Sequence, residues 1–156
     1  MTIEVLEKAR DTARKAGDKA RVVTLNDVIA AVRKAETAGK KKVELTEAMV
    51  NEALVSYRKM LKDGIAAAPA DSVLRQTYTE QLGILMEYCP PVLEDEIEIE
   101  NLITKTLYNQ NIPIGRKTKG QMMKALMPVL RAQYADMEVA MPLIELMITE
   151  AEKANG

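Results

Sequence analysis

The stretch EIEIENLITKTL, residues 96–107, decides the fold class of this chain. Its first five residues alternate glutamate and isoleucine, which is the pattern of a half-buried strand. Over the longer window, however, Ile99, Leu102, Ile103 and Leu107 recur at the three- and four-residue spacings of one helix face. A lone strand would also have no pairing partner. We therefore predict a helix here and an all-α fold.

The same helical periodicity and the helix-boundary residues predict the remaining elements. Thr46 is expected to cap a helix that ends near Gly64. The next helix is expected to end at Pro90-Pro91, because proline cannot donate to the helix hydrogen bonds. Pro128 should bend or shorten the helix that Thr118 opens. These helices are expected over 2–16, from 18 to before 39, from 46 to about 64, from 71 or 72 to 89, from 118 through 130, and from about 136 through 151.

The chain contains no tandem repeat and no long linker that would mark a domain boundary. The best candidate for a boundary is the Cys89-Pro90-Pro91 corner, where the prolines end a helix. We predict an N-terminal four-helix domain over residues 1–90 and a small three-helix domain over residues 91–156. Helix-on-helix packing is the architecture that these elements allow.

The composition excludes several classes of site. Histidine is absent and Cys89 is the single cysteine, so the commonest metal ligand, the commonest general base and an intrachain disulfide are all missing. We expect no metal and no cofactor. No signal peptide or membrane-spanning stretch is recognisable, so we expect a cytoplasmic protein. Without Phe or Trp, the core should consist of Leu, Ile, Val, Ala and the ten Met.

Charge is distributed unevenly along the chain. Residues 1–65 hold 14 Lys and Arg against 10 Asp and Glu, whereas residues 66–156 hold 8 against 13. Five acids lie between Glu94 and Glu100, and we interpret them as residues that complement the dipole at a helix start rather than as a metal or acid–base site. Residues 101–135 then contain no acid at all.

Within this acid-free segment, the run Gly115-Arg116-Lys117-Thr118-Lys119-Gly120 lacks the residue order and the preceding strand of a nucleotide-binding loop. A helix start rimmed by cations is instead a candidate anion or phosphate-backbone site. A second basic group near residues 15–42 is mixed with acids and has no aromatic residue to stack on bases. The candidate phosphate-binding residues are Arg116, Lys117, Lys119, Lys124 and Arg131.

Three segments of the chain carry a resemblance to a known family. They are EQLGILMEYCP at residues 80–90, KGQMMKALMP at 119–128, and ARVVTL followed by IAAV within 20–32. The first resembles an acid-x-Leu-x-Ile-Leu-x-x-Tyr-Leu-Pro helix ending, with Cys89 in place of Leu. The second resembles a Gly-x-x-Met-Lys-x-Leu-Met element, and the third a long first helix. All three are features of the YqeY-type proteins in the GatB/YqeY family, and the resemblance covers nearly the whole chain.

This resemblance implies an N-terminal helical domain joined to a small domain like the tail of the B subunit of the tRNA-dependent amidotransferase. In that enzyme the tail helps to hold tRNA while other domains perform the chemistry. The kinase-like and amidase parts are missing here, so catalysis by this chain alone is not implied. The chain also departs from the family after Leu130, where residues 132–137 lack both glycines of a Gly-Arg-Ala-Asp-Gly-like turn.

We therefore expect an accessory, non-catalytic protein that contacts tRNA or another structured RNA. The first alternative is a protein–protein adaptor that docks through a helical face, with the acidic 94–100 segment opposing a basic partner. The second is an amidotransferase-like carbon–nitrogen ligase with glutamine as the amide donor. That activity would require a pocket in which Glu80, Lys119 or Lys124 converge.

Overall fold

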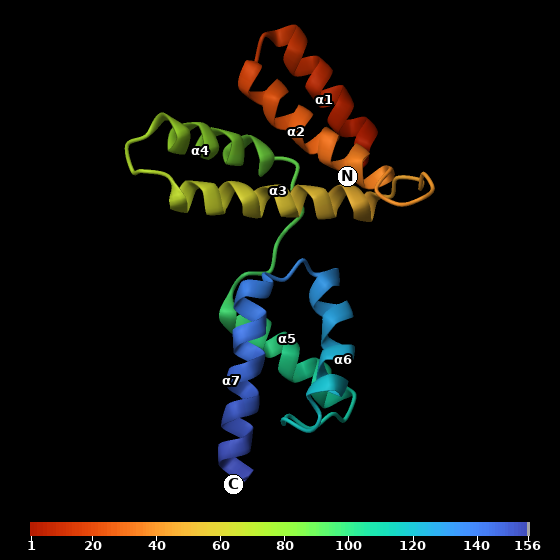
Figure 1. The fold of residues 1–156 in the computed structure, drawn as a ribbon, viewed down its shortest axis with the longest axis vertical. Helices are drawn as coiled ribbons and strands as arrows, with labels where there is room; N and C mark the ends of the chain where they lie inside the picture. Colours follow the sequence, from red (N-terminus) through yellow and green to blue (C-terminus); the bar gives the residue numbers. More distant parts are fainter. Residues whose placement is uncertain (156) are drawn as a thin grey trace. The chain divides into compact units, whose positions relative to one another are not determined.

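The structure is a computed structural model that describes residues 1–155, and these residues form seven α-helices and no strand (Figure 1). Leu93 and Ala135 form an isolated parallel bridge. The all-α prediction is therefore confirmed, including the helix over residues 96–107. The helices are α1 (Ile3–Ala16), α2 (Lys19–Glu36), α3 (Glu47–Ala67), α4 (Val73–Leu85), α5 (Glu96–Asn109), α6 (Lys119–Ala132) and α7 (Met137–Asn155).

Short polar side chains begin several of the helices, as the sequence predicts. The Asp18 carboxylate accepts a hydrogen bond from the Arg21 N–H at 3.1 Å, after Gly17 ends α1 with a φ of 74°. Thr46 and Ser72 cap α3 and α4 in the same manner. These caps satisfy N–H groups that have no partner within their helix.

The contacts divide the chain into two compact units, Met1–Pro90 and the residues from Pro91 onward. In the first unit α1 packs on α2, α3 packs on α4, and α2 also packs on α3 and α4. Figure 1 shows α3 and α4 side by side. The core of this unit is aliphatic apart from Tyr57, and its most buried side chains include Leu6, Leu25, Val28, Val32, Val50, Leu54, Leu61 and Leu85.

The second unit is built around α5, which packs on both α6 and α7. Leu93 joins the segment before α5 to the α6–α7 connection, because its N–H donates to the Tyr134 carbonyl and its carbonyl accepts from the Asp136 N–H. Buried residues from all three helices form the core, and they include Ile99, Ile103, Leu107, Met122, Leu126, Leu130, Ile144 and Ile148.

Three helix ends differ from the prediction. α3 does not fade at Gly64 but continues to Ala67, because Gly64 is used for close packing against Tyr78 rather than for a helix end. α4 ends at Leu85, before Pro90, and residues 86–89 form turns. Pro128 lies inside α6 and does not shorten it, because the helix continues to Ala132.

Methionine contributes less to the core than expected. Among the methionines, which all lie in the described part of the chain, only Met122 is buried, whereas Met60, Met86 and Met141 are exposed. Leucine and isoleucine fill both cores instead, together with valine in the core of the first unit. None of the helices over residues 1–155 is both long and apolar enough to cross a membrane.

Candidate functional site

The predicted basic rim lies around the loop that connects α5 to α6. Thr118 occupies the N-cap position of α6, but its side chain makes no capping hydrogen bond to the described helix. Its hydroxyl instead donates to the Pro113 carbonyl at 2.6 Å and lies 3.2 Å from the Gly115 carbonyl oxygen. These two contacts of the Thr118 hydroxyl close the loop between Pro113 and the start of α6.

Two of the predicted cations are bound to α7. Arg116 Nη1 donates to Glu145 Oε2 at 2.9 Å, and Lys119 Nζ donates to the other carboxylate oxygen of Glu145. The Arg116 backbone N–H donates to Glu152 Oε1 at 2.7 Å. Hydrogen bonds from Lys119 and Arg116 hold the pKa of Glu145 below its ordinary value. Arg116 and Lys119 thus already have an intramolecular anion.

The other three predicted cations, Lys117, Lys124 and Arg131, are exposed and free. None of the three pairs with a carboxylate within residues 1–155. Lys124 and Arg131 are seven residues apart on α6, nearly two turns, so they share a face at a spacing of about 10 Å. Lys117 continues this seven-residue spacing in the turn before the helix. We call Lys117, Lys124 and Arg131 the cationic face.

The structure therefore separates the five predicted residues into two groups instead of one rim. Glu145 and Glu152, which decide this separation, were missed from the sequence. These two acids lie 26 to 36 residues beyond the groups that they bind. Their own seven-residue spacing is common among surface acids of helices and does not single them out. Their sequence positions gave no signal that would have found them.

The acidic run before and within α5 acts at the helix start. Asp95 is the N-cap and accepts a hydrogen bond from the Glu98 N–H at 2.9 Å, while Glu96 and Glu98 lie in the first turn. These acids complement the helix dipole, as predicted. Among the described residues, no group of three His, Cys, Asp or Glu side chains is placed to hold a metal ion.

Acids pair with three cations of the basic group in the N-terminal unit. Arg33 pairs with Glu7 at 2.6 Å and with Glu36 at 3.3 Å, and Lys42 pairs with Glu36 at 3.4 Å. Arg21 pairs with Asp18 and Glu87. Lys15, Lys34 and Lys41 of this group are exposed and pair with no carboxylate among the described residues, but acids lie between them in the sequence, unlike in the cationic face.

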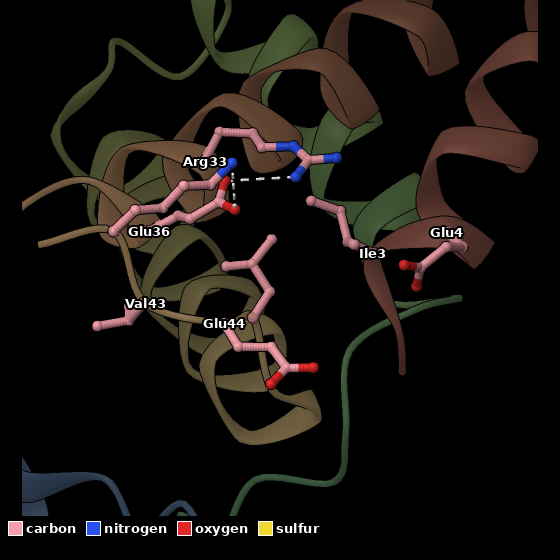
Figure 2. Close-up of a pocket in the computed structure, with 8 residues that line it drawn as sticks. Ile3, Glu4, Arg33, Glu36, Val43 and Glu44 are labelled. Atoms are coloured by element: carbon pink, nitrogen blue, oxygen red, sulfur yellow. Dashed lines mark hydrogen bonds and ion pairs between the residues drawn. The ribbon is translucent and has the colours of Figure 1, made fainter.

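A pocket of about 450 Å³ lies beside these ion pairs, between α1, the end of α2 and the segment before α3. Figure 2 shows Glu36 bound to Arg33, and Ile3, Glu4, Val43 and Glu44 also line the pocket. The nearly buried Glu36 carboxylate is thus satisfied by cations of its own unit. Neither Glu80 nor Lys119 nor Lys124 lines this pocket.

Arg21 joins two of the segments that carry the family resemblance. It comes from the start of α2, and its Nη1 atom donates to the Tyr88 hydroxyl at 2.9 Å and to the Glu87 carboxylate in the turn after α4. Its guanidinium carbon also lies 6.0 Å from the centre of the Tyr88 ring. The hydrogen bonds to Glu87 and Tyr88 raise the pKa of Arg21.

Cys89, in the same segment, is half-buried and is not part of a nucleophilic constellation. Burial raises the pKa of its thiol, and the charge of Arg58 offsets this only in part. Because the thiolate is the reactive form, a raised pKa makes Cys89 a weak nucleophile at neutral pH.

Residues 132–137, which lack the glycines of the family-like turn, still form a turn of the kind that ordinarily uses glycine. Tyr134 has a φ of 50°, in the left-handed region, and the Ala135 N–H donates back to the Leu130 carbonyl at 2.9 Å. This arrangement is the usual end of a helix that is followed by glycine. The chain therefore forms the turn without the residue that favours it.

Comparisons with known proteins agree with the resemblance. The family model of the Yqey-like proteins matches residues 3–147, which include six complete helices and the first half of α7. A comparison with curated proteins found no match. Because the family model spans nearly the whole chain, this protein belongs to the family of YqeY-like proteins.

Proposed function

We propose that the protein is an accessory, non-catalytic RNA-binding protein, and that the cationic face contacts the phosphate backbone of tRNA or another structured RNA. The single observation that carries the proposal is the arrangement of Lys117, Lys124 and Arg131. These side chains are exposed, repeat every seven residues and have no carboxylate partner within residues 1–155. The resemblance to the amidotransferase tail, which helps to hold tRNA, supports the same partner.

Overall acidity does not oppose binding at this face. The sequence pI is about 5.7, but α6 and the loop before it contain no acid. At physiological ionic strength the screening length is about 8 Å, so a phosphate at this face senses chiefly the charges near it. No aromatic residue lies between Lys117 and Arg131, which favours backbone contact over base stacking.

We also propose that residues 1–90 and 91–156 are two domains and that the second resembles the amidotransferase tail. Each of the two buried clusters draws its side chains from one side of Pro90. RNA contact would then belong to the second domain, while the Arg21–Tyr88 contact stabilises the first.

The test compares affinity for total tRNA at low salt between the native chain and the K117A/K124A/R131A variant. A matched control, K15A/K34A/K41A, removes the same charge from lysines that are exposed and unpaired within the described part of the N-terminal unit. We expect the first variant to lose at least tenfold in affinity and the control to lose less than threefold. Equal losses would show that net charge, not the cationic face, determines binding.

A second candidate function, protein docking, is favoured by the outward face of α5. Ile97 is 68% exposed and Tyr108 is 82% exposed, and acids surround Ile97 in the sequence. An apolar and acidic surface of this kind suits a basic protein partner. Docking at this face predicts that an I97K/Y108K variant loses a partner that the native chain retains in a pull-down, with unchanged tRNA affinity. Retention of every partner by the variant would exclude this face.

A further inference from the structure

The loop before α6 already holds two carboxylates, and both come from α7. Glu145 accepts hydrogen bonds from Arg116 and Lys119, and Glu152 accepts one from the Arg116 backbone N–H. Glu152 Oε1 would lie 3.1 Å from a Cβ atom at Gly115, so the glycine lets this carboxylate approach the loop closely. The seven-residue spacing of the two acids places them on one face of α7, about 10 Å apart.

These contacts use the same donors that a phosphate would use. A guanidinium, an ammonium and a backbone N–H are the groups that bind phosphate oxygens in RNA complexes. Carboxylate and phosphate oxygens are therefore alternative acceptors for Arg116 and Lys119. The Arg116, Lys119 and Glu145 side chains are 54%, 38% and 42% exposed, so an external anion can reach them.

We propose that Glu145 acts as an intramolecular competitor of RNA phosphate, which withholds Arg116 and Lys119 from the RNA-binding surface. The inference rests on the proposed function and adds its regulation. In the native chain three cations of the cationic face engage phosphates, and removal of the Glu145 charge raises the number to five. Exposed ion pairs are weak, so this competition tunes affinity and does not abolish binding.

The number of engaged cations can be measured from salt dependence. The slope of log affinity against log salt is roughly −0.7 to −0.9 for each phosphate contact. The experiment titrates total tRNA binding with salt for the native chain, for E145Q and for E150Q. Glu150 is the matched control, because it is an exposed acid on α7 without an ion pair among the described residues. Circular dichroism verifies that each variant retains its helices.

We expect E145Q to steepen the slope by about 1 to 2 and to bind about three- to tenfold more tightly at low salt, since two more contacts form. E150Q makes the same change in net charge and should keep the native slope. The variant E145Q/R116A/K119A should also return to the native slope, because the released cations are removed again.

Each remaining outcome overturns a distinct statement. If K117A/K124A/R131A loses the native salt dependence but E145Q and E150Q behave alike, the competition by Glu145 is wrong while the proposed function stands. If E145Q steepens the slope but E145Q/R116A/K119A keeps the steep slope, then Arg116 and Lys119 are not the cause of the steeper slope. The inference is wrong in that case too. If the native chain does not bind tRNA at low salt, both the proposed function and this inference fail.

Discussion

Arg21 is the residue whose contacts best explain a family motif. It binds Asp18 at the start of its own helix and, across the fold, Glu87 and Tyr88 after α4. Glu87 and Tyr88 of the helix-ending motif thus connect the segment after α4 to the start of α2. The Tyr88 hydroxyl and the Glu87 carboxylate lose their common donor if Arg21 is replaced.

We predict that R21M lowers the free energy of unfolding by about 1–2 kcal/mol, the size expected for a few partly exposed hydrogen bonds to a charged group. R14M is the matched control, because Arg14 is exposed and pairs only locally, with Asp11 of its own helix, among the described residues. The control should change stability by less than about 0.5 kcal/mol. Urea unfolding measures both, and equal midpoints for R21M and the native chain would contradict the role of Arg21.

The raised pKa of the Cys89 thiol gives a prediction for its reactivity and for the pH dependence of stability. Burial raises the pKa of its thiol, so the folded state favours the protonated form. This contribution to stability is present below the pKa of an unfolded thiol, about 8.5, and is lost as pH rises above it. We expect iodoacetamide to alkylate Cys89 at pH 7.5 at least tenfold more slowly in the native chain than in guanidinium. Faster alkylation of the native chain would instead identify an activated thiol.

At this scale the sequence predicts residue types but not their partners. It indicates the cations at 116, 117, 119, 124 and 131 because a basic segment without acids is visible in one dimension. Whether each cation is free depends on Glu145 and Glu152, which the fold brings from another helix. Long-range pairs of this kind depend on helix packing, which periodicity alone does not determine.

Helices and their starting residues are the elements that the sequence predicts best. Hydrophobic spacing and N-caps such as Asp18 and Thr46 are local, and the structure confirms them. Helix ends were predicted less well, because glycine and proline have more than one use. Gly64 was interpreted as the end of α3, but it allows α4 to approach. A Cβ at Gly64 would lie 2.8 Å from Cε2 of Tyr78.

Gly64 and Gly83 therefore predict opposite effects of alanine. Both lie inside helices, where alanine is favoured over glycine by about 1 kcal/mol. G83A meets no neighbour within 4 Å and should gain this stability. G64A should instead lower the free energy of unfolding by about 1–3 kcal/mol, the usual cost of overpacking. Thermal unfolding of both variants tests the pair, and a stabilised G64A would show that Tyr78 moves aside freely.

For the whole molecule, the main structural feature is the presence of two compact units with separate cores. The proline corner at residues 89–91 lies where the chain passes from one unit to the next, and it remains our predicted domain boundary, because proline cannot continue a helix. The composition predicted cores of Leu, Ile, Val, Ala and Met, but it did not show that most methionines would lie at the periphery of the cores. That outcome depends on how many Leu, Ile and Val fall on the inward faces.

If these units are domains, fragments 1–90 and 91–156 should each fold. We expect each fragment to have a helical circular dichroism spectrum and a cooperative urea transition, since each retains its own buried cluster. The smaller fragment should unfold at lower urea, because short chains bury a smaller fraction of their surface. A fragment without a cooperative transition would mean that its core depends on the other unit.

The measurement that tests the central claim most directly is the salt dependence of tRNA binding by the cationic face. Three phosphate contacts predict a slope of log affinity against log salt of roughly −2 to −3 for the native chain. The slope should approach zero for K117A/K124A/R131A and stay near the native value for K15A/K34A/K41A. Absence of binding by the native chain at low salt, or the same slope in all three proteins, would contradict the account.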